Sequence, residues 1–514
     1  MAAAAPIVES CSGRLRGATS AGIHVFKGIR YAESTSGANR FLPPQPVIPW
    51  AGVRDALAPG ASAPQFAVPH HTDPFYRWYS KIEPISEDCL FLNVFSPGLD
   101  DARRPVLFWI HGGGWREFAG TAPGFDGTAL AREGDVVVVT INHRLNGFGF
   151  LRIEDTDERF ADAANAGMLD VVAALEWVRD NIASFGGDPL NVTLFGESGG
   201  ASKIAAILAL HPAHGLFHKA IMQSSAGGMH LAEPEEAAGT AASLARELGL
   251  ARVDGAALQK VPMAVLVETM RRTGGAFRGS IDGRSFGAHP FAGHASSLSV
   301  NIPLLAGCTN TETTYYLRGD DRNFALGFTD VTRRLARFLR RDSASANSIV
   351  GHYRAIYPSL DASRILVAIT SDFVFKRNTY AMAAMHAAIG APTYAFLFER
   401  ESSVEGGRMG SCHTSEVPFV FGTTDAARSA IGEGHDIVPM TRRMMATWCA
   451  FARTGNSSNP TVPAWTPYSE AQRHTMVLNL DSRLEDDPGG AARAALDGEA
   501  WFGYGHALID FCRD

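Results

Sequence analysis

The sequence predicts an α/β protein with a mostly parallel central sheet covered by helices on both faces, and three observations support this. Short apolar runs rich in β-branched residues alternate with longer segments of helical periodicity. The runs are apolar at consecutive positions, as expected of strands that are buried on both faces. The chain has 514 residues, of which 46% are hydrophobic, so it can bury a large core.

The expected elements follow in chain order. Strands are predicted at 106–110, 136–141, 192–195, 217–223, 302–306 and 394–398. Helices are expected over 168–182 and 201–210, on either side of the third strand, and a closing helix within 491–514. Because helical segments separate successive strands, the strands are expected to run parallel.

Two longer helix-rich segments interrupt this alternation, near 230–300 and 315–392. They contain amphipathic patterns over 237–250 and 329–339, and neither has the polar, low-complexity composition of a linker. We expect both to leave a common core and to form the walls of a substrate cleft. Residues 1–514 are therefore predicted to form one domain.

Composition and charge exclude several classes of function. The net charge is −7 at pH 7 and no Lys/Arg-rich run is present, so nucleic acid is not an expected partner. The chain has no apolar run of about 18 residues, the length that a membrane span needs. The N-terminus lacks the basic and apolar regions of a signal peptide. We therefore expect a cytoplasmic protein without a membrane partner.

The six cysteines are widely scattered, without a CxxC pair or zinc-finger spacing. Neither a disulfide framework nor a metal site is expected from them, and reduced thiols are the simplest interpretation. Lysine is scarce relative to arginine and alanine is abundant, which suggests a GC-rich bacterial genome.

The pattern Gly196-x-Ser198-x-Gly200 lies between a β-rich run and a helix-compatible run. Strand, sharp turn and helix together are typical of a nucleophile elbow, which exposes a serine on a strained turn. Taken alone, the pattern also fits a glycine-rich turn whose serine caps a helix. A nucleophilic serine would need a base, a group that orients the base, and donors for an oxyanion.

Glycines that follow the first predicted strand are candidate oxyanion donors. Residues 111–115 have the sequence HGGGW, so the N–H groups of Gly113 and Gly114 can turn toward one point. Gly199, the residue after the serine, offers a third N–H. A phosphate-binding loop would instead need a Lys-Ser/Thr pair after the glycines, and a Trp-Arg pair stands there. We therefore expect an oxyanion hole.

Two loops that follow predicted strands contain candidates for the acid and the base. Glu312 lies shortly after strand 302–306, and His413 lies in a polar loop after strand 394–398. Active-site groups of open α/β sheets lie beyond the carboxyl ends of strands. With Ser198, the chain order is Ser, Glu, His, the order found in α/β-hydrolases. This agreement favours Glu312 and His413 over the other loop residues of their types.

Several longer motifs extend along nearly the whole chain. They are GIRYA (28–32), RF (40–41), SEDCLFLNV (86–94), NHR (142–144), GFL (149–151), FGGDPLNVTLFGESGG (185–200), and Trp448 with FARTG (451–455). Together they resemble the type-B carboxylesterases, the family that also contains the cholinesterases. The resemblance implies the α/β-hydrolase fold and a catalytic triad of Ser198, Glu312 and His413. It also implies oxyanion donors at Gly113, Gly114 and Gly199, and a supporting buried carboxylate at Glu197.

The chain also departs from the family pattern. Arg30 stands where relatives usually have proline. Exported relatives usually join the cysteine of the SEDC segment to an earlier one, and Ala63 stands at that earlier position, so Cys89 is expected to be unpaired. The loop 64–88 then lacks the disulfide that would fix its position. Its aromatic side chains could line a gorge and stack on a cationic or aryl group, or simply pack within the loop: His70, Phe75, Trp78 and Tyr79.

These observations predict a serine hydrolase that cleaves small-molecule carboxylic esters through an acyl-enzyme, without metal, nucleotide or organic cofactor. Two alternatives stay open: the same triad acting on carbamates, amides or lactones, and a non-catalytic cholinesterase-like binding protein. Trp115, Phe277, Phe328 and Phe419 are candidate pocket residues, although core packing explains each equally well. The oligomeric state, monomer or homodimer, also stays open.

Overall fold

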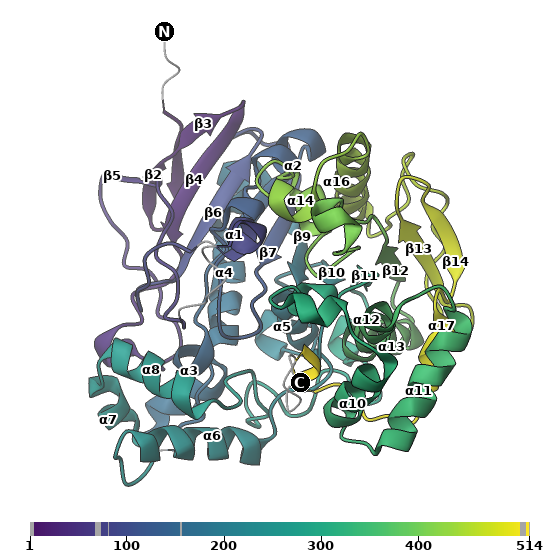
Figure 1. The fold of residues 1–514 in the computed structure, drawn as a ribbon. Coiled ribbons are helices and arrows are strands. Elements are labelled where there is room, and N and C mark those ends of the chain that lie inside the picture. The colour runs from purple at the N-terminus through teal and green to yellow at the C-terminus, as the bar shows by residue number, and fades with distance from the viewer. Residues whose placement is uncertain (1–4, 67–72, 81, 155–156, 504–509, 513–514) are drawn as a thin grey trace.

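The computed structural model describes residues 5–66, 73–80, 82–154, 157–503 and 510–512 (Figure 1). An eleven-stranded sheet crosses it in the order β14-β13-β12-β11-β10-β9-β7-β8-β6-β4-β3. The strands are β3 (Ala18–Ser20), β4 (Ile23–Arg30), β6 (Phe91–Ser96), β7 (Arg104–Ile110), β8 (Val137–Ile141), β9 (Gly187–Glu197), β10 (Lys219–Gln223), β11 (Leu304–Thr309), β12 (Thr393–Phe398), β13 (His474–Leu478) and β14 (Arg483–Asp486).

The pairings from β8 through β7, β9, β10, β11 and β12 to β13 are parallel. The strands outside this block, β3, β4, β6 and β14, pair antiparallel. A small second sheet joins β1 (Ile7–Ser10), β2 (Gly13–Arg16) and β5 (Val53–Asp55). The prediction of a largely parallel α/β sheet is therefore confirmed, and all six predicted strands are present with shifted ends.

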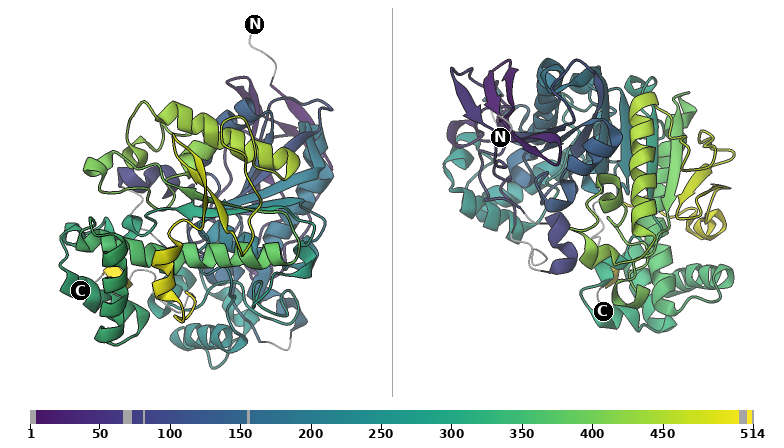
Figure 2. Two further views of the ribbon diagram at one scale, coloured as in Figure 1. Left: turned by 90° about the vertical axis from the view of Figure 1, so that its right-hand side faces the viewer. Right: turned by 90° about the horizontal axis from the view of Figure 1, so that it is seen from above.

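Helices cover both faces of the sheet (Figure 2). Successive side chains of a strand point to opposite faces. Accordingly, Val106, Phe108 and Ile110 of β7 join one hydrophobic cluster, while Leu107 and Trp109 join the other. The first cluster includes α4 (Ala166–Asn181), α5 (Gly199–Ile207) and α13 (Arg377–Ala388), and the second includes α2 (Thr128–Gly134), α14 (Val417–Phe421) and α16 (Ile437–Thr454).

The two helix-rich segments form separate groups of helices below the sheet in Figure 1. The first contains α6 (Pro234–Glu247), α7 (Gly255–Lys260) and α8 (Met263–Thr273); the second contains α9 (Thr314–Leu317), α10 (Phe328–Leu339), α11 (Ser343–Ile356) and α12 (Ala362–Ser371), and leads into α13. Each group has a hydrophobic cluster of its own. In α10 the buried residues Val331, Leu335, Phe338 and Leu339 form the apolar stripe that its amphipathic pattern predicts. The organisation of 1–514 as one domain stays a prediction.

The closing helix expected within 491–514 is wrong for the part of that segment that the structure describes. There the chain forms α17 (Gly490–Arg493) and two 3₁₀ turns, at Ala494–Leu496 and Asp510–Cys512. Gly498 has a φ of 86°, a left-handed conformation that no α-helix can contain. The hydrophobic residues Leu496, Phe502 and Phe511 pack instead against the cluster of α10–α12.

Two ion pairs connect the SEDC motif to the N-terminal part of the chain. Arg40 donates to both carboxylate oxygens of Glu87, at 2.6 and 2.5 Å, and both side chains are nearly buried. Arg30 donates to both oxygens of Asp88, each at 2.6 Å. The arginine that replaces the family's usual proline thus has a local partner in the motif.

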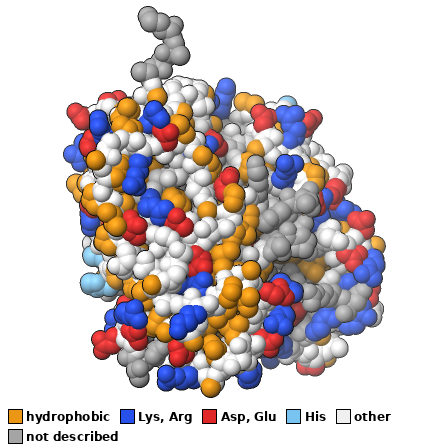
Figure 3. All heavy atoms as spheres, turned by 90° about the vertical axis from the view of Figure 1, so that its left-hand side faces the viewer, with side chains coloured by type: hydrophobic (Ala, Val, Ile, Leu, Met, Phe, Trp, Pro, Cys, Tyr) orange, Lys and Arg blue, Asp and Glu red, His pale blue; other side chains and the backbone are white. Residues whose placement is uncertain are grey.

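Two properties of the protein bear on its possible partners: the distribution of charge on its surface and the apolar character of its helices. On the face shown in Figure 3, acidic and basic side chains are interspersed rather than gathered into a patch of one sign. Among the described helices, none combines the length and the apolar character needed to cross a bilayer.

A buried ion pair joins the loop after β8 to α4. Arg144 donates to both oxygens of Asp170, at 2.8 and 2.6 Å, and the two side chains are 2% and 0% exposed. Arg144 also donates to the carbonyl of Leu42 at 2.7 Å. The pair therefore connects three distant parts of the chain.

We expect Asp170→Asn to lower the free energy of unfolding by about 3–5 kcal/mol, because it leaves a buried guanidinium without a counter-charge. Urea unfolding followed by circular dichroism measures this loss. Asp55→Asn is the matched control, since Asp55 pairs with Arg16 at the surface and its removal should change stability little. Equal losses in both variants would contradict the assigned importance of burial.

Candidate active site

Ser198 lies on a sharp turn between β9, which ends at Glu197, and α5, which begins at Gly199. Its φ of 55° and ψ of −120° are strained for a residue with a side chain and cost about 1–3 kcal/mol. A hydrogen bond from Ser198 N to the carbonyl of Gln223 (2.8 Å) holds the turn against β10. A Cβ at Gly200 would lie 2.0 Å from the carbonyl oxygen of Ile110, so only glycine fits there.

His413 and Glu312 meet beyond the carboxyl ends of neighbouring strands, β12 and β11. His413 Nδ1 lies 2.6 Å from Glu312 Oε2, and both side chains are buried. The other oxygen of Glu312 accepts hydrogen bonds from Ser224 Oγ (2.6 Å) and Thr309 N (2.8 Å). The carboxylate is thus held at both oxygens and can fix the orientation of the imidazole.

The glycine loop after β7 approaches the start of α5 closely. Gly113 and Gly114 have φ values of 80° and 64°, which favour glycine. Among the described residues, the N–H groups of both donate no hydrogen bond, so they are free for a ligand. A Cβ at Gly199 would lie 2.0 Å from the carbonyl oxygen of Gly114, so the alanine often found in relatives does not fit this arrangement.

The comparison with known families settles what kind of protein carries this geometry. The model of the carboxylesterase family matches residues 4–493. The chain belongs to the carboxylesterase family. It is a carboxylic-ester hydrolase with the α/β-hydrolase fold, and both predictions are confirmed.

Individual relatives extend over almost the whole carboxylesterase. The para-nitrobenzyl esterase of Bacillus subtilis is 34% identical, with 95% of this chain and 98% of that protein covered. The phenmedipham hydrolase of Pseudarthrobacter oxydans is also 34% identical, over 92% of this chain and 95% of its own length. The structure of carboxylesterase EST55 from Geobacillus stearothermophilus is similar with a TM-score of 0.83 and 36% identity, over 95% of this chain and 99% of that one.

Glu197 approaches the imidazole from the side opposite to Glu312. Its Oε1 lies 3.1 Å from His413 Nε2, and its Oε2 accepts a hydrogen bond from the Tyr79 hydroxyl at 2.6 Å. Burial favours the neutral imidazole, but the carboxylates of Glu197 and Glu312 outweigh it and raise the pKa of His413. Burial raises the pKa of Glu197, because it disfavours the charged carboxylate. The charge of His413 and the hydrogen bond from Tyr79 lower the pKa, but by less.

Ser198 itself is half-buried, and no hydrogen bond joins its Oγ to His413 among the described residues. Nε2 of the imidazole faces Glu197 instead. Catalytic hydrogen bonds are often long in the absence of substrate and form only in the complex. The geometry therefore brings Glu312 and His413 together, and it brings the imidazole within 3.1 Å of Glu197, the residue that precedes Ser198.

Sequence reasoning missed a second buried layer of the centre. Gln223, at the end of β10, donates from Nε2 to Glu416 (2.9 Å) and accepts from Trp448 Nε1 (3.0 Å). Burial raises the pKa of Glu416 to about 8. In the sequence, Glu416 follows His413 closely and Trp448 shortly precedes the FARTG motif, and these positions were the available signal.

Most of the aromatic residues considered for a pocket pack in the interior. Phe277 and Phe419 belong to hydrophobic clusters and are 2% and 0% exposed. Phe328 is half-buried beneath the guanidinium of Arg354, 3.9 Å from its ring centre. Trp115 is also buried, next to the glycine loop.

The aromatic residues of the loop 64–88 show the same preference for packing. Phe75, Trp78 and Tyr79 lie on or at the end of α1 (Pro74–Ser80) and are buried in the cluster that includes α14 and α16. His70 lies outside the described residues. The rings that border His413 come instead from a different part of the chain: Tyr315, Tyr316 and Phe375, with centroids 5.6, 5.7 and 4.7 Å from the imidazole.

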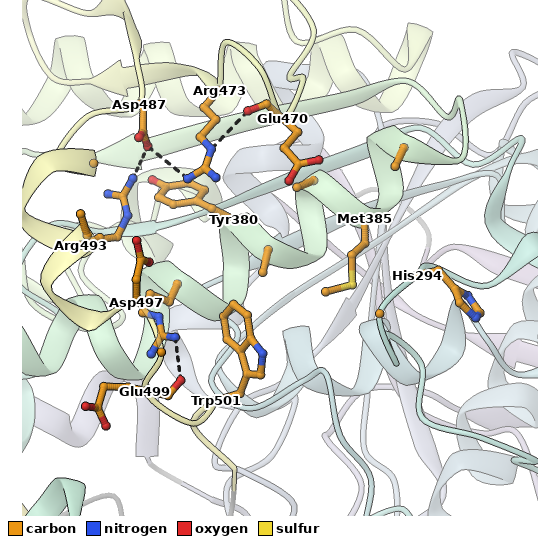
Figure 4. A pocket seen from close by; sticks show the side chains of 18 of the residues that line it. His294, Tyr380, Met385, Glu470, Arg473, Asp487, Arg493, Asp497, Glu499 and Trp501 are labelled. Carbon is orange, nitrogen blue, oxygen red and sulfur yellow. Dashed lines mark hydrogen bonds and ion pairs between the residues drawn. The ribbon is translucent and has the colours of Figure 1, made fainter. Parts of the chain in front are cut away.

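A separate cavity of about 970 Å³ lies between α13 and the C-terminal segment. Tyr380, Met385, Arg493 and Trp501 are among its lining residues (Figure 4). Ser198, Glu312 and His413 do not line it. The described residues also contain no cluster of three His, Cys, Asp or Glu side chains that could hold a metal ion.

We expect Glu197→Gln to move the acid limb of the kcat/KM profile to lower pH by about one unit or more. The reason is that a base must be neutral, and removing the carboxylate 3.1 Å from Nε2 lowers the pKa of His413. The pH dependence of ester hydrolysis measures the shift. Glu416→Gln should move the limb less, because Glu416 makes no contact with the imidazole; an unmoved limb in Glu197→Gln would contradict this account.

Proposed function

We propose that this carboxylesterase cleaves esters through an acyl-enzyme on Ser198, with His413 as the base and Glu312 as the group that orients it. The observation that supports this most directly is the 2.6 Å contact between His413 Nδ1 and buried Glu312, beside a serine on a strained strand–helix turn. With Nδ1 engaged by the carboxylate, Nε2 is the nitrogen available to exchange protons with Ser198.

In the first half of the reaction, His413 Nε2 takes the proton of Ser198 as Oγ attacks the ester carbonyl. The N–H groups of Gly113, Gly114 and Gly199 stabilise the resulting oxyanion, each by about 3–4 kcal/mol. The imidazolium then protonates the leaving alkoxide. In the second half, His413 activates a water that hydrolyses the acyl-enzyme.

Glu197 has a supporting role in this proposal. The imidazole turns from Glu197 toward Ser198 Oγ when substrate binds, and Glu197 stabilises the imidazolium that forms. The Tyr79 hydroxyl, 2.6 Å from Glu197 Oε2, keeps the carboxylate in place.

We also infer a small-molecule ester as the substrate and the cytoplasm as the location. Among the described residues, Cys11, Cys89, Cys308, Cys412 and Cys449 form no disulfide, and Cys89, whose counterpart in exported relatives is bridged, is fully buried. Free thiols are typical of a reducing compartment.

We expect Ser198→Ala to lower kcat/KM by about 10⁵-fold or more, and Glu312→Gln by about 10⁴-fold because the imidazole loses its orienting carboxylate.

A fluorophosphonate probe should label Ser198 of the folded wild-type protein, as read by mass spectrometry of its peptide. Ser36→Ala, at an exposed serine, is the control and should be labelled normally. Ester hydrolysis that survives Ser198→Ala would refute the acyl-enzyme.

Substrate class is tested by comparing aryl and alkyl esters of graded acyl length with matched amides, carbamates and lactones. We expect the esters to be hydrolysed fastest, because an alkoxide leaves the tetrahedral intermediate more easily than an amine. The kcat/KM values give the ranking. If amides or carbamates had a higher kcat/KM than every matched ester, the proposed substrate class would be wrong, while the proposed triad would be unaffected.

A further inference from the structure

Lys203 is a buried lysine next to the candidate oxyanion hole that the proposed reaction does not use. It lies on α5, five positions after Ser198, and its side chain is 0% exposed. Nζ donates to the carbonyl oxygen of Gly114 at 2.9 Å and to that of His111 at 3.4 Å. Both acceptors belong to the glycine loop.

In the described part of the chain, burial is the one influence on the pKa of this ammonium group, and no carboxylate raises it. No ion pair among the described residues includes Lys203. Its neighbours are the ring of Trp115, 5.5 Å from Nζ, and the stacked rings of His111 and His143. Burial lowers the pKa of Lys203 to about 7. Burial, together with the charge of Lys203, lowers the pKa of His111 to about 3 and that of His143 well below its usual value. Both imidazoles are therefore neutral at neutral pH.

A buried lysine without an ion-pair partner lowers the stability of the fold, because its ammonium group loses its hydration; a methionine would fill the same space without this loss. The position of Nζ suggests which function offsets the loss of stability. The two carbonyls that it binds lie at the ends of the HGGG segment, and the N–H groups of Gly113 and Gly114 lie between them. Lys203 thus connects both ends of the glycine loop to α5, the helix whose first residue is Gly199.

We propose that Lys203 is a positioning residue of the oxyanion hole: its hydrogen bonds to the two carbonyls hold the glycine loop against α5, and its protonated form adds a positive charge next to that loop. This inference rests on the proposed acyl-enzyme function. Donors stabilise a transition state only if they already point to the place where negative charge develops. A nearby charge in a site without water adds to that stabilisation, because its field is weakly screened.

Two substitutions separate the effect of the hydrogen bonds from that of the charge. Lys203→Met removes both and keeps a similar length, whereas Lys203→Gln keeps an amide donor and removes the charge. Lys219→Met is the matched control. Lys219 is another buried lysine, bonded to Asn191, but it lies at the first residue of β10, the opposite end of that strand from Gln223.

The measurements are kcat and KM for an aryl ester and the inhibition constant of a trifluoromethyl ketone, which forms a tetrahedral adduct with a nucleophilic serine. We expect Lys203→Met to lower kcat by about 10²-fold and to weaken the ketone by a similar factor, with KM changed by less than about threefold. The kcat of Lys203→Gln and its affinity for the ketone should lie between those of Lys203→Met and wild type. Lys219→Met should stay within about twofold of wild type in all three quantities.

A purely space-filling role for Lys203 predicts a different result. Folded Lys203→Met would then bind the ketone within about twofold of wild type, and the inference would be overturned. If Lys203→Met does not fold, Lys203→Leu, which also removes both the donor and the charge, takes its place, and unchanged ketone affinity in that variant overturns the inference. Failure of the fluorophosphonate to label wild-type Ser198 would instead refute the proposed function itself, so the two failures are distinguishable.

Discussion

The turn at Ser198 depends on the parallel pairing of β9 with β10. In this register Gln223 lies beside Glu197, and its carbonyl accepts the N–H of Ser198. The same residue's side chain connects to Glu416 and Trp448. The strained backbone of the serine is thus held by a buried part of the sheet, which can carry a strain that an exposed loop would release.

Around this turn the protein gathers charges that are expensive to bury. Glu197 and Glu312 flank His413, and each carboxylate has at least one hydroxyl donor, from Tyr79 or Ser224. These contacts offset the desolvation of the carboxylates and favour the protonated imidazole. Lys203 binds the carbonyls of the glycine loop. The site therefore combines two carboxylates beside the imidazole of His413 with a lysine next to the candidate oxyanion hole.

The sequence predicted six of the seven strands of the parallel block and the helices α4, α5 and α10 from their local apolar patterns. It missed β13 of that block and the antiparallel strands β4 and β6. Polar residues shorten the apolar run of each: His24 and Lys27 in β4, Asn93 in β6, and His474 and Thr475 in β13. It also predicted a closing helix at the C-terminus, where glycines and tertiary packing produce short turns instead.

The sequence alone determined the family, the order of Ser198, Glu312 and His413, and their position after strands, because motifs and the alternation of strand and helix patterns are local properties of the chain. Only the tertiary structure decided that Tyr79 binds Glu197 and that Lys203 binds the carbonyls of His111 and Gly114. These contacts join residues about one hundred positions apart, and no local periodicity encodes such pairs. They result from the way the sheet brings separate loops to one edge, where their polar groups must find partners.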